Sequence, residues 1–350
     1  MFPAAPRAPR GGPRRDRRPG RPGPRRARVV AATLATALAL TASSCGVTRG
    51  DDSADLDMWI PNSPGGGYDQ TGRAAVGVME QDDITGGSFQ VTNILGAGGA
   101  AAMSQLMGQE GNEHLLMTIG LGVVGSTYSF ASDARPQDAT PIAQLIEEQE
   151  GVLVPAESPF ETIDDLVEAW KADPGSIVVG GGSSPGGPDH LFPMQLAETV
   201  GIDPQEVRYV TYDGGGPLTS ALLGNKIQVG FSGLSEFEGQ IAAGDLRVLA
   251  VSGEERLTGE AVKDAPTLTE SGIDLVFINW RGVLAPPGIS EERQDELIAY
   301  LSEMHDSPQW QQTLEKNGWI DAFRTGDDFE AFLLEQDDRV SSTLEELDLL

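Results

Sequence analysis

The stretch Ile177-Val-Val-Gly-Gly-Gly-Ser-Ser-Pro-Gly-Gly-Pro-Asp-His-Leu191 decides the fold, because it joins a β-branched run to a helical stretch through a glycine-rich turn. Residues 177–179 predict a strand, and the glycines and serines of 180–187 predict a loop. In open α/β sheets, ligands bind outside the carboxyl ends of the strands, where helix N-termini offer free N–H groups to anions. The stretch therefore predicts one wall of an anion-binding cleft.

The same arrangement recurs along the chain. Three other predicted strands are followed by glycine-rich turns at residues 64–67, 96–99 and 213–216. The runs that predict strands, separated mostly by helical stretches, are 58–60, 89–94, 115–119, 207–212, 227–231 and 248–251. This alternation predicts an α/β fold built on mostly parallel sheets.

Two longer extended segments, 141–155 and 275–287, predict strands that cross between two lobes. On this interpretation residues 55–150 and 278–350 form the first lobe, and residues 151–277 form the second. A chain of 350 residues is long enough for two such domains.

The C-terminal tail from Glu291 to Leu347 has a helical pattern throughout. Trp310, Trp319 and Phe329 are the apolar side chains expected to anchor it. The tail is therefore predicted to pack as helices on the first lobe.

The N-terminal segment differs in charge from the rest of the chain. Ten arginines lie between Arg7 and Arg28, and an apolar run from Val29 to Leu40 precedes small residues and Cys45. This order predicts a signal peptide over residues 1–44. The apolar run is too short to span a bilayer.

Cys45 is the only cysteine, so no intramolecular disulfide can form. Ala-Ser-Ser-Cys after an apolar run resembles the lipobox of bacterial lipoproteins, which prefers leucine where this chain has Ala42. The resemblance implies a lipidated Cys45, a tether over residues 45–54, and an exported protein anchored to the outer face of the cytoplasmic membrane. The alternative is a plain secretory peptide with an incidental thiol.

The remainder of the chain is strongly acidic. Removing residues 1–44 takes away ten arginines and Asp16, which leaves 14 basic and 52 acidic residues and a formal net charge of −38. Nucleic acid is excluded as a partner, because binding it needs a basic surface. An anionic ligand would meet an opposing long-range field, so donors inside a closed cleft must hold it.

Two motifs are typical of enzymes, and each has a feature that argues against catalysis. Residues 96–101 match the loose dinucleotide fingerprint, but they follow the second predicted strand, and no strand about 20 residues further on ends in an acid. Residues 182–186 fit the nucleophile elbow of a serine hydrolase, with His305 in chain order, yet Pro185 has no N–H for an oxyanion hole. We expect no catalytic residues and no cofactor, and a hydrolase using Ser184 is the lesser alternative.

No metal site is expected, because the three histidines lack ligand spacing and a single cysteine forms no thiolate cluster. His190 lies in the first turn of the helix after the serine-rich loop, where it either faces the cleft or stays partly exposed. Asp69 is first an N-cap candidate and second a ligand contact. Arg73 and Arg281 are the cations expected near the cleft, and Arg281 is equally able to pair with an acidic neighbour.

Several turns follow one another in an order that resembles a known family. They include Pro61-Asn-Ser-Pro-Gly-Gly-Gly-Tyr-Asp69, Asn93-Ile-Leu-Gly-Ala-Gly-Gly99, Pro141-Ile-Ala-Gln-Leu145, Gly180 to Leu191, Tyr212-Asp-Gly-Gly-Gly-Pro217, Leu246-Arg-Val-Leu-Ala-Val251 and Asn279-Trp-Arg-Gly282. The chain resembles, over nearly all of residues 56–320, the periplasmic substrate-binding proteins of tripartite tricarboxylate transporters, also called the Bug family. Asp213 departs from the pattern, since many members have lysine there, and the second turn lacks the family's arginine before proline.

The resemblance implies a type II periplasmic-binding-protein-like fold: two α/β lobes, two crossover strands and a ligand cleft between the lobes. It implies a monomer that captures a small organic carboxylate for the large and small membrane subunits of a transporter. The Trp280-Arg281-Gly282 sequence resembles the branch that binds citrate-like tri- or dicarboxylates. A sensor that reports the ligand to a membrane receptor is the alternative. The expected ligand-binding residues are Gly66, Gly67, Tyr68, Asp69, Gly98, Gly99, Gly182, Ser183, Ser184, His190, Tyr212, Gly214 and Arg281.

Overall fold

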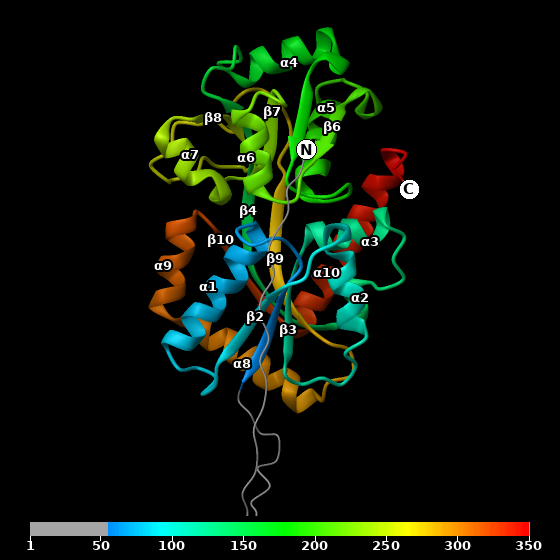
Figure 1. Ribbon diagram of the computed structural model, residues 1–350, viewed down its shortest axis with the longest axis vertical. Helices are drawn as coiled ribbons and strands as arrows, with labels where there is room; N and C mark the ends of the chain where they lie inside the picture. The colour runs from blue at the N-terminus through cyan, green and yellow to red at the C-terminus, as the bar shows by residue number, and fades with distance from the viewer. Residues whose placement is uncertain (1–54, 350) are drawn as a thin grey trace, which may run out of the picture. The chain divides into compact units, whose positions relative to one another are not determined.

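The strands of this protein join into one sheet that runs through both lobes (Figure 1). A computed structural model describes residues 55–349. The strand order is β2-β1-β3-β9-β4-β7-β5-β6, and β8 and β10 pair with β4 beside this path. The strands are β1 (Leu56–Ile60), β2 (Phe89–Asn93), β3 (Leu115–Gly120), β4 (Thr140–Pro155), β5 (Val178–Gly181), β6 (Arg208–Thr211), β7 (Val229–Gly233), β8 (Leu246–Val251), β9 (Ile278–Ala285) and β10 (Ile320–Thr325).

The long strand β4 changes partners part-way along its length. Its first part, as far as Gln149, pairs antiparallel with β9. From Glu150 onward it pairs antiparallel with β7, and from Gly151 with β8. The two predicted crossover segments are therefore β4 and β9, and β4 contributes to the sheet of both lobes. The predicted boundaries of the lobes remain a prediction.

Parallel pairing between the named strands occurs only towards the two ends of the sheet. In the first lobe β1 pairs parallel with β2 and β3, and in the second β5 pairs parallel with β6 and β7. Every pairing made by β4 or β9 is antiparallel. The expectation of mostly parallel sheets was wrong, because βαβ connections build only the outer strands while the linking strands run against their neighbours.

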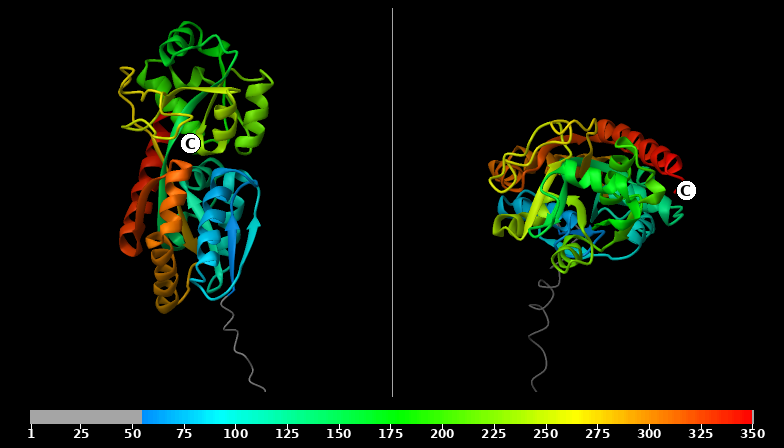
Figure 2. Two further views of the ribbon diagram at one scale, coloured as in Figure 1. Left: turned by 90° about the vertical axis from the view of Figure 1, so that its left-hand side faces the viewer. Right: turned by 90° about the horizontal axis from the view of Figure 1, so that it is seen from above.

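Helices cover the sheet on both sides (Figure 2). In the first lobe, α1, α8 and α9 share one apolar core, while α10 packs against α3 and β4. The helices are α1 (Gly67–Gln81), α2 (Ala100–Met107), α3 (Leu121–Ser129), α4 (Ile163–Ala172), α5 (Pro188–Thr199), α6 (Gly215–Leu223), α7 (Glu238–Ala243), α8 (Glu291–Asp306), α9 (Pro308–Asn317) and α10 (Gly326–Glu346). Short 3-10 turns are η1 (Ala97–Gly99), η2 (Pro136–Asp138), η3 (Pro174–Ser176), η4 (Pro204–Glu206) and η5 (Leu234–Phe237).

The C-terminal tail is not helical throughout, as its pattern had suggested. Helix α9 ends at a left-handed Gly318 (φ 64°), and β10 then pairs antiparallel with β4. A free edge along β4 supplies hydrogen bonds that the local helical pattern does not reveal. The expected anchors Trp310, Trp319 and Phe329 are all buried, which confirms that part of the prediction.

The predicted signal peptide, the tether and Cys45 lie outside the described residues. Within residues 55–349, no helix is both long and apolar enough to cross a membrane.

Candidate functional site

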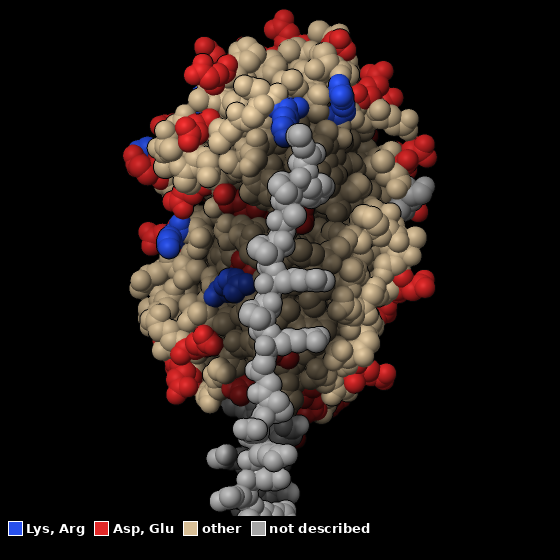
Figure 3. Space-filling model, in the orientation of Figure 1, with Lys and Arg blue, Asp and Glu red and all other residues tan. Residues whose placement is uncertain are grey.

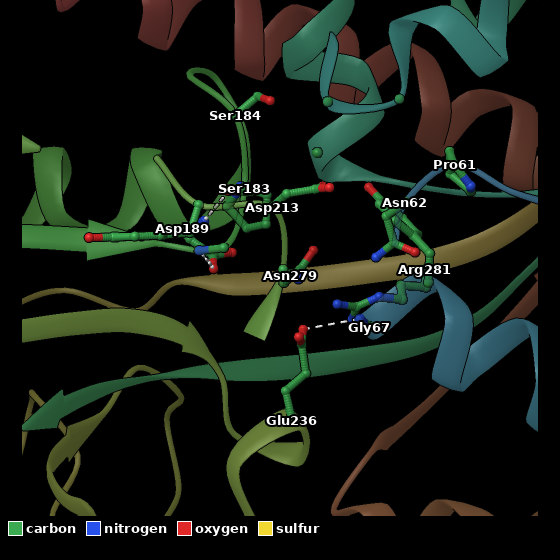
Figure 4. Close-up of a pocket in the computed structure, with 18 of the residues that line it drawn as sticks. Pro61, Asn62, Gly67, Ser183, Ser184, Asp189, Asp213, Glu236, Asn279 and Arg281 are labelled. Atoms are coloured by element: carbon green, nitrogen blue, oxygen red, sulfur yellow. Dashed lines mark hydrogen bonds between the residues drawn. The ribbon is translucent and has the colours of Figure 1, made fainter. Parts of the chain in front are cut away.

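A pocket opens between the two lobes, where loops follow the carboxyl ends of β1, β5 and β6 (Figures 3 and 4). On the face shown in Figure 3 the molecule is hollowed between the lobes, and acidic side chains outnumber basic ones over the face as a whole. The pocket is lined by Pro61, Asn62, Gly67, Tyr68, Gly96, Gly98, Gly99, Gly122, Gly182, Ser183, Ser184, Pro188, Asp189, Tyr212, Asp213, Gly214, Glu236, Asn279 and Arg281.

The lobes touch across the pocket, so the structure is a closed form. The Ser63 hydroxyl donates to Asp213 Oδ2 at 2.5 Å, and the Ser129 hydroxyl donates to the carbonyl oxygen of Pro185 at 2.7 Å. A cavity of about 60 Å³ remains, well below the ~300–1,000 Å³ typical of ligand pockets. A solute must therefore enter while the lobes are apart.

Glycine is required where the first-lobe turn meets the second lobe. Gly98 has φ 61°, and a Cβ there would overlap the Ser184 side chain. The left-handed conformation and the close approach both exclude larger residues. The glycine motifs of the sequence thus allow the two lobes to come into direct contact.

The cleft floor consists of Glu148 and Glu150 on β4 and Asn279 and Arg281 on β9. Side chains alternate between the two faces of a strand, which places Asn279 and Arg281 on the same side. Trp280, between them, points the other way and donates from Nε1 to Gln336 Oε1 at 3.1 Å. All four floor residues are at most 6% exposed.

Charge pairing holds the cleft floor together. Arg281 forms an ion pair with Glu148, and Asn279 Nδ2 donates to Glu150 Oε1 at 3.0 Å. Burial alone would lower the pKa of Arg281, but the Glu148 and Glu236 carboxylates raise it above its ordinary value. Burial also raises the pKa of Glu150 well above normal. Arg281 is therefore a permanent cation beneath the pocket.

The second-lobe loop, residues 182–190, is held by hydrogen bonds from its backbone amides to its own side chains. The amide of Gly182 donates to Asp189 Oδ2 at 2.7 Å, and the amide of Asp189 donates to Ser183 Oγ at 3.0 Å. The amide of Gly186 donates to His190 Nδ1 at 3.1 Å. Burial lowers the pKa of His190 to about 4, which keeps the imidazole neutral so that Nδ1 can accept.

Tyr68 links the first turn of α1 to α3. Its hydroxyl accepts from the amide of Val123 at 3.1 Å, and its ring lies 5.4 Å from the Arg281 guanidinium carbon. Burial raises the pKa of Tyr68 to about 12, so its hydroxyl proton is retained for donation. The phenol thus places a neutral donor beside Arg281.

The sequence matches a family model described as the tripartite tricarboxylate transporter family receptor, over residues 81–349. The chain belongs to this family.

Relatives and solved structures agree with the assignment. UPF0065 proteins of Cupriavidus necator and Pseudomonas sp. (strain P51) are each 26% identical, and the alignments cover 76% and 81% of this chain and 80% and 83% of theirs. A solved structure titled as a periplasmic transporter is 25% identical with a TM-score of 0.76, covering 84% of this chain and 97% of its own.

Two further structures share the fold. MatC from Rhodopseudomonas palustris, with bound malate, is 20% identical with a TM-score of 0.73, over 83% of this chain and 98% of its own. An R. palustris protein with adipate, Rpa4515, is 19% identical with a TM-score of 0.76, over 84% of this chain and 97% of its own. The type II binding-protein fold, with its two crossover strands and cleft, is thereby confirmed.

Family membership makes the chain an exported, non-enzymatic solute receptor. Within residues 55–349 the Ser184 hydroxyl makes no hydrogen bond to a histidine. His305 instead lies beside Asp306 and Asp321 and stacks on Phe323. The part of the chain that the structure describes holds no group of His, Cys, Asp or Glu suited to a metal ion.

The structure brings ten of the thirteen expected ligand-binding residues to the pocket, and three lie elsewhere. Gly66 does not line it, and Asp69 accepts from Arg73 Nε at 2.7 Å on the far side of the loop. His190 is buried beneath the second-lobe loop against Tyr209. Arg73 also stays outside the pocket. The residues that line it are Gly67, Tyr68, Gly98, Gly99, Gly182, Ser183, Ser184, Tyr212, Gly214 and Arg281.

Sequence reasoning missed the acids and amides of the pocket. Asn62, Asp189, Glu236 and Asn279 line it, and Asp213 had been noted only as a departure from the family pattern. Asp189 and Asn62 lie inside recognised loops and could have been included. Glu236 follows β7 in a turn without glycines, so no turn signal marked it.

Proposed function

We propose that this receptor captures a small organic carboxylate in the cleft and delivers it to the large and small membrane subunits of a tripartite transporter. The observation that carries the proposal is a buried donor: Arg281 is 6% exposed, and its Nε has no hydrogen-bond partner among the described residues. Arg281 lines the pocket, and a guanidinium there with an unused N–H favours a carboxylate as its partner. The malate and adipate of the two structural neighbours are also carboxylates, which supports this ligand class.

The solute enters the open cleft, and the lobes close about β4 and β9. Its carboxylate meets Arg281, the hydroxyls of Ser183 and Ser184, and the Gly98–Gly99 turn, with Tyr212 completing the wall. Burial of the solute in the closed form strengthens each of these hydrogen bonds, because water no longer competes for the donors. No covalent step takes place.

We also propose that the receptor works as a monomer held at the outer face of the cytoplasmic membrane. The Arg-rich leader, the apolar run and Ala-Ser-Ser-Cys45 support a signal peptide and lipidation. Incorporation of labelled fatty acid that Cys45→Ser abolishes is expected, and incorporation unaffected by the substitution would rule the anchor out.

The ligand class is tested by thermal unfolding of the protein from Gly46 onward. The panel contains malate, succinate, citrate, aromatic carboxylates, 4-aminobutyrate and neutral sugars. A ligand at about 100 times its dissociation constant adds about 2.7 kcal/mol, so we expect a carboxylate to raise the midpoint by several degrees. A rise with sugars and none with any carboxylate would overturn the proposal.

A further inference from the structure

The carboxylate of Glu236 occupies the positive ends of two helices. Glu236 lies in η5, and its Oε1 accepts from the amide of Gly67 at 3.0 Å while its Oε2 accepts from the amide of Gly215 at 2.9 Å. Gly67 is the first residue of α1 in the first lobe, and Gly215 is the first residue of α6 in the second (Figure 4). An internal carboxylate thus takes two amides that would otherwise face an anionic ligand.

The pocket lining is negative overall. Among the described residues that line it, Asp189, Asp213 and Glu236 are acidic and Arg281 is the only cation. Arg281 is already paired with Glu148. The lining residues therefore offer no second positive charge to a further ligand carboxylate.

The protonation state of Glu236 responds to the charge of the ligand. Burial, together with the nearby Asp189 carboxylate, raises the pKa of Glu236 to about 8, although the Gly215 amide lowers it and Arg281 also acts against the rise. Burial raises the pKa of Asp189 as well. Near neutral pH Glu236 is therefore mostly protonated in the empty pocket; a second ligand carboxylate would hold it protonated and receive no positive partner, whereas a ligand cation would favour the ionised carboxylate.

A buried donor is nevertheless available to one ligand carboxylate. Arg281 Nε is unpartnered, 6% of the residue is exposed, and its guanidinium lies beside Gly67 and Glu236 in Figure 4. A carboxylate offers about four lone-pair sites, and the two amides use two of those on Glu236. Glu236 can accept from a ligand without releasing either helix.

Resting on the proposed function, we infer that the cleft selects a solute with one carboxylate and a separate ammonium group, and that Glu236 is the specificity-determining residue that accepts the ammonium. The carboxylate binds Arg281 and the ammonium binds Glu236. A citrate trianion, which the sequence resemblance implies, presents the wrong charge to Glu236, Asp189 and Asp213.

The test is isothermal titration of the protein from Gly46 onward with matched ω-amino acids and dicarboxylates of three to six carbons. One pair is 5-aminopentanoate and glutarate, with pentanoate as the monocarboxylate of equal length. At the chain length that binds best, we expect the ω-amino acid to bind at least about tenfold more tightly than the dicarboxylate. Glu236→Gln removes the charge and is expected to bring the two dissociation constants within about threefold.

Two further variants serve as controls for the effect of Glu236→Gln on ligand preference. Glu238→Gln removes an exposed acid two residues away and should retain the full preference. Gly215→Ala places a Cβ at 2.6 Å from Glu236 Oε2, so the carboxylate must move, and the preference should fall as it does in Glu236→Gln.

The outcomes separate the two proposals. A dicarboxylate that binds the unmodified protein as tightly as its ω-amino partner, or a preference that survives in both Glu236→Gln and Gly215→Ala, would overturn the inference and leave carboxylate capture intact. Absence of binding by every member of the series, together with a thermal shift by sugars and by no carboxylate of the wider panel, would overturn the proposed function itself.

Discussion

The cleft floor and the second-lobe loop are both polar, but different interactions hold them. In the floor, Arg281 and Glu148 lie on different strands and are 133 residues apart in the sequence. In the loop, amides bind side chains at most seven residues away, as Gly182 binds Asp189. The floor therefore depends on the tertiary fold, whereas the loop is largely determined by local sequence.

The difference predicts how each region responds to change. A buried charge that loses its partner cannot be solvated instead, so substitutions in the cleft floor should strongly lower the free energy of unfolding. A loop that loses one of several local hydrogen bonds can relax at a smaller cost. The predictions below test this ranking, beginning with the largest effect.

Glu148→Gln keeps the shape of the side chain and removes its charge. Because Arg281 is left as a buried cation without its closest partner, the free energy of unfolding should fall by about 3–5 kcal/mol in urea titrations. The matched control is Glu270→Gln, which breaks the exposed ion pair with Arg256 and should cost much less than Glu148→Gln, because solvent screens exposed charges. A loss below about 1 kcal/mol in Glu148→Gln would show that the floor is no more sensitive than the surface.

His190 makes the second-lobe loop sensitive to acid. Its pKa is about 4 in the folded protein and ordinarily 6.5, so the unfolded chain binds the proton first. The stabilising contribution is complete above pH 6.5 and is lost as the pH falls towards 4, by about 3 kcal/mol in total. His190→Asn keeps an acceptor for the Gly186 amide without a titrating group, and stability measured from pH 7 to 4 should fall less in this variant. Parallel curves for the two proteins would contradict the prediction.

The contrast between local and long-range contacts also explains which parts of the site could be predicted from the sequence. The loop could be predicted because its strand, glycines, serines and helix start are contiguous in the sequence. Local patterns also predicted seven strands and both crossover segments. Arg281 was expected near the cleft, yet its pairing with Glu148 was only one of two alternatives. Glu236 was missed because its role depends on Gly67 and Gly215, which the fold brings to it from separate helices. Contacts between distant segments leave no periodic pattern, so Glu236 could not be predicted, whereas Asp189 and Asp213 lie inside turns that the sequence does mark.

Substitutions of two adjacent serines test the loop with the smallest expected changes in stability. Ser183 Oγ accepts from the amide of Asp189, so Ser183→Ala should lower the free energy of unfolding by about 1 kcal/mol. The Ser184 hydroxyl has no hydrogen-bond partner among residues 55–349 and lines the pocket, so Ser184→Ala should change stability by less than about 0.5 kcal/mol. If Ser184 instead serves the solute, its loss should weaken ligand binding about fivefold to tenfold, as removal of one hydrogen bond does. Equal losses of stability in the two variants would mean that the loop is not held by the specific bonds described, because only one of the two hydroxyls makes one.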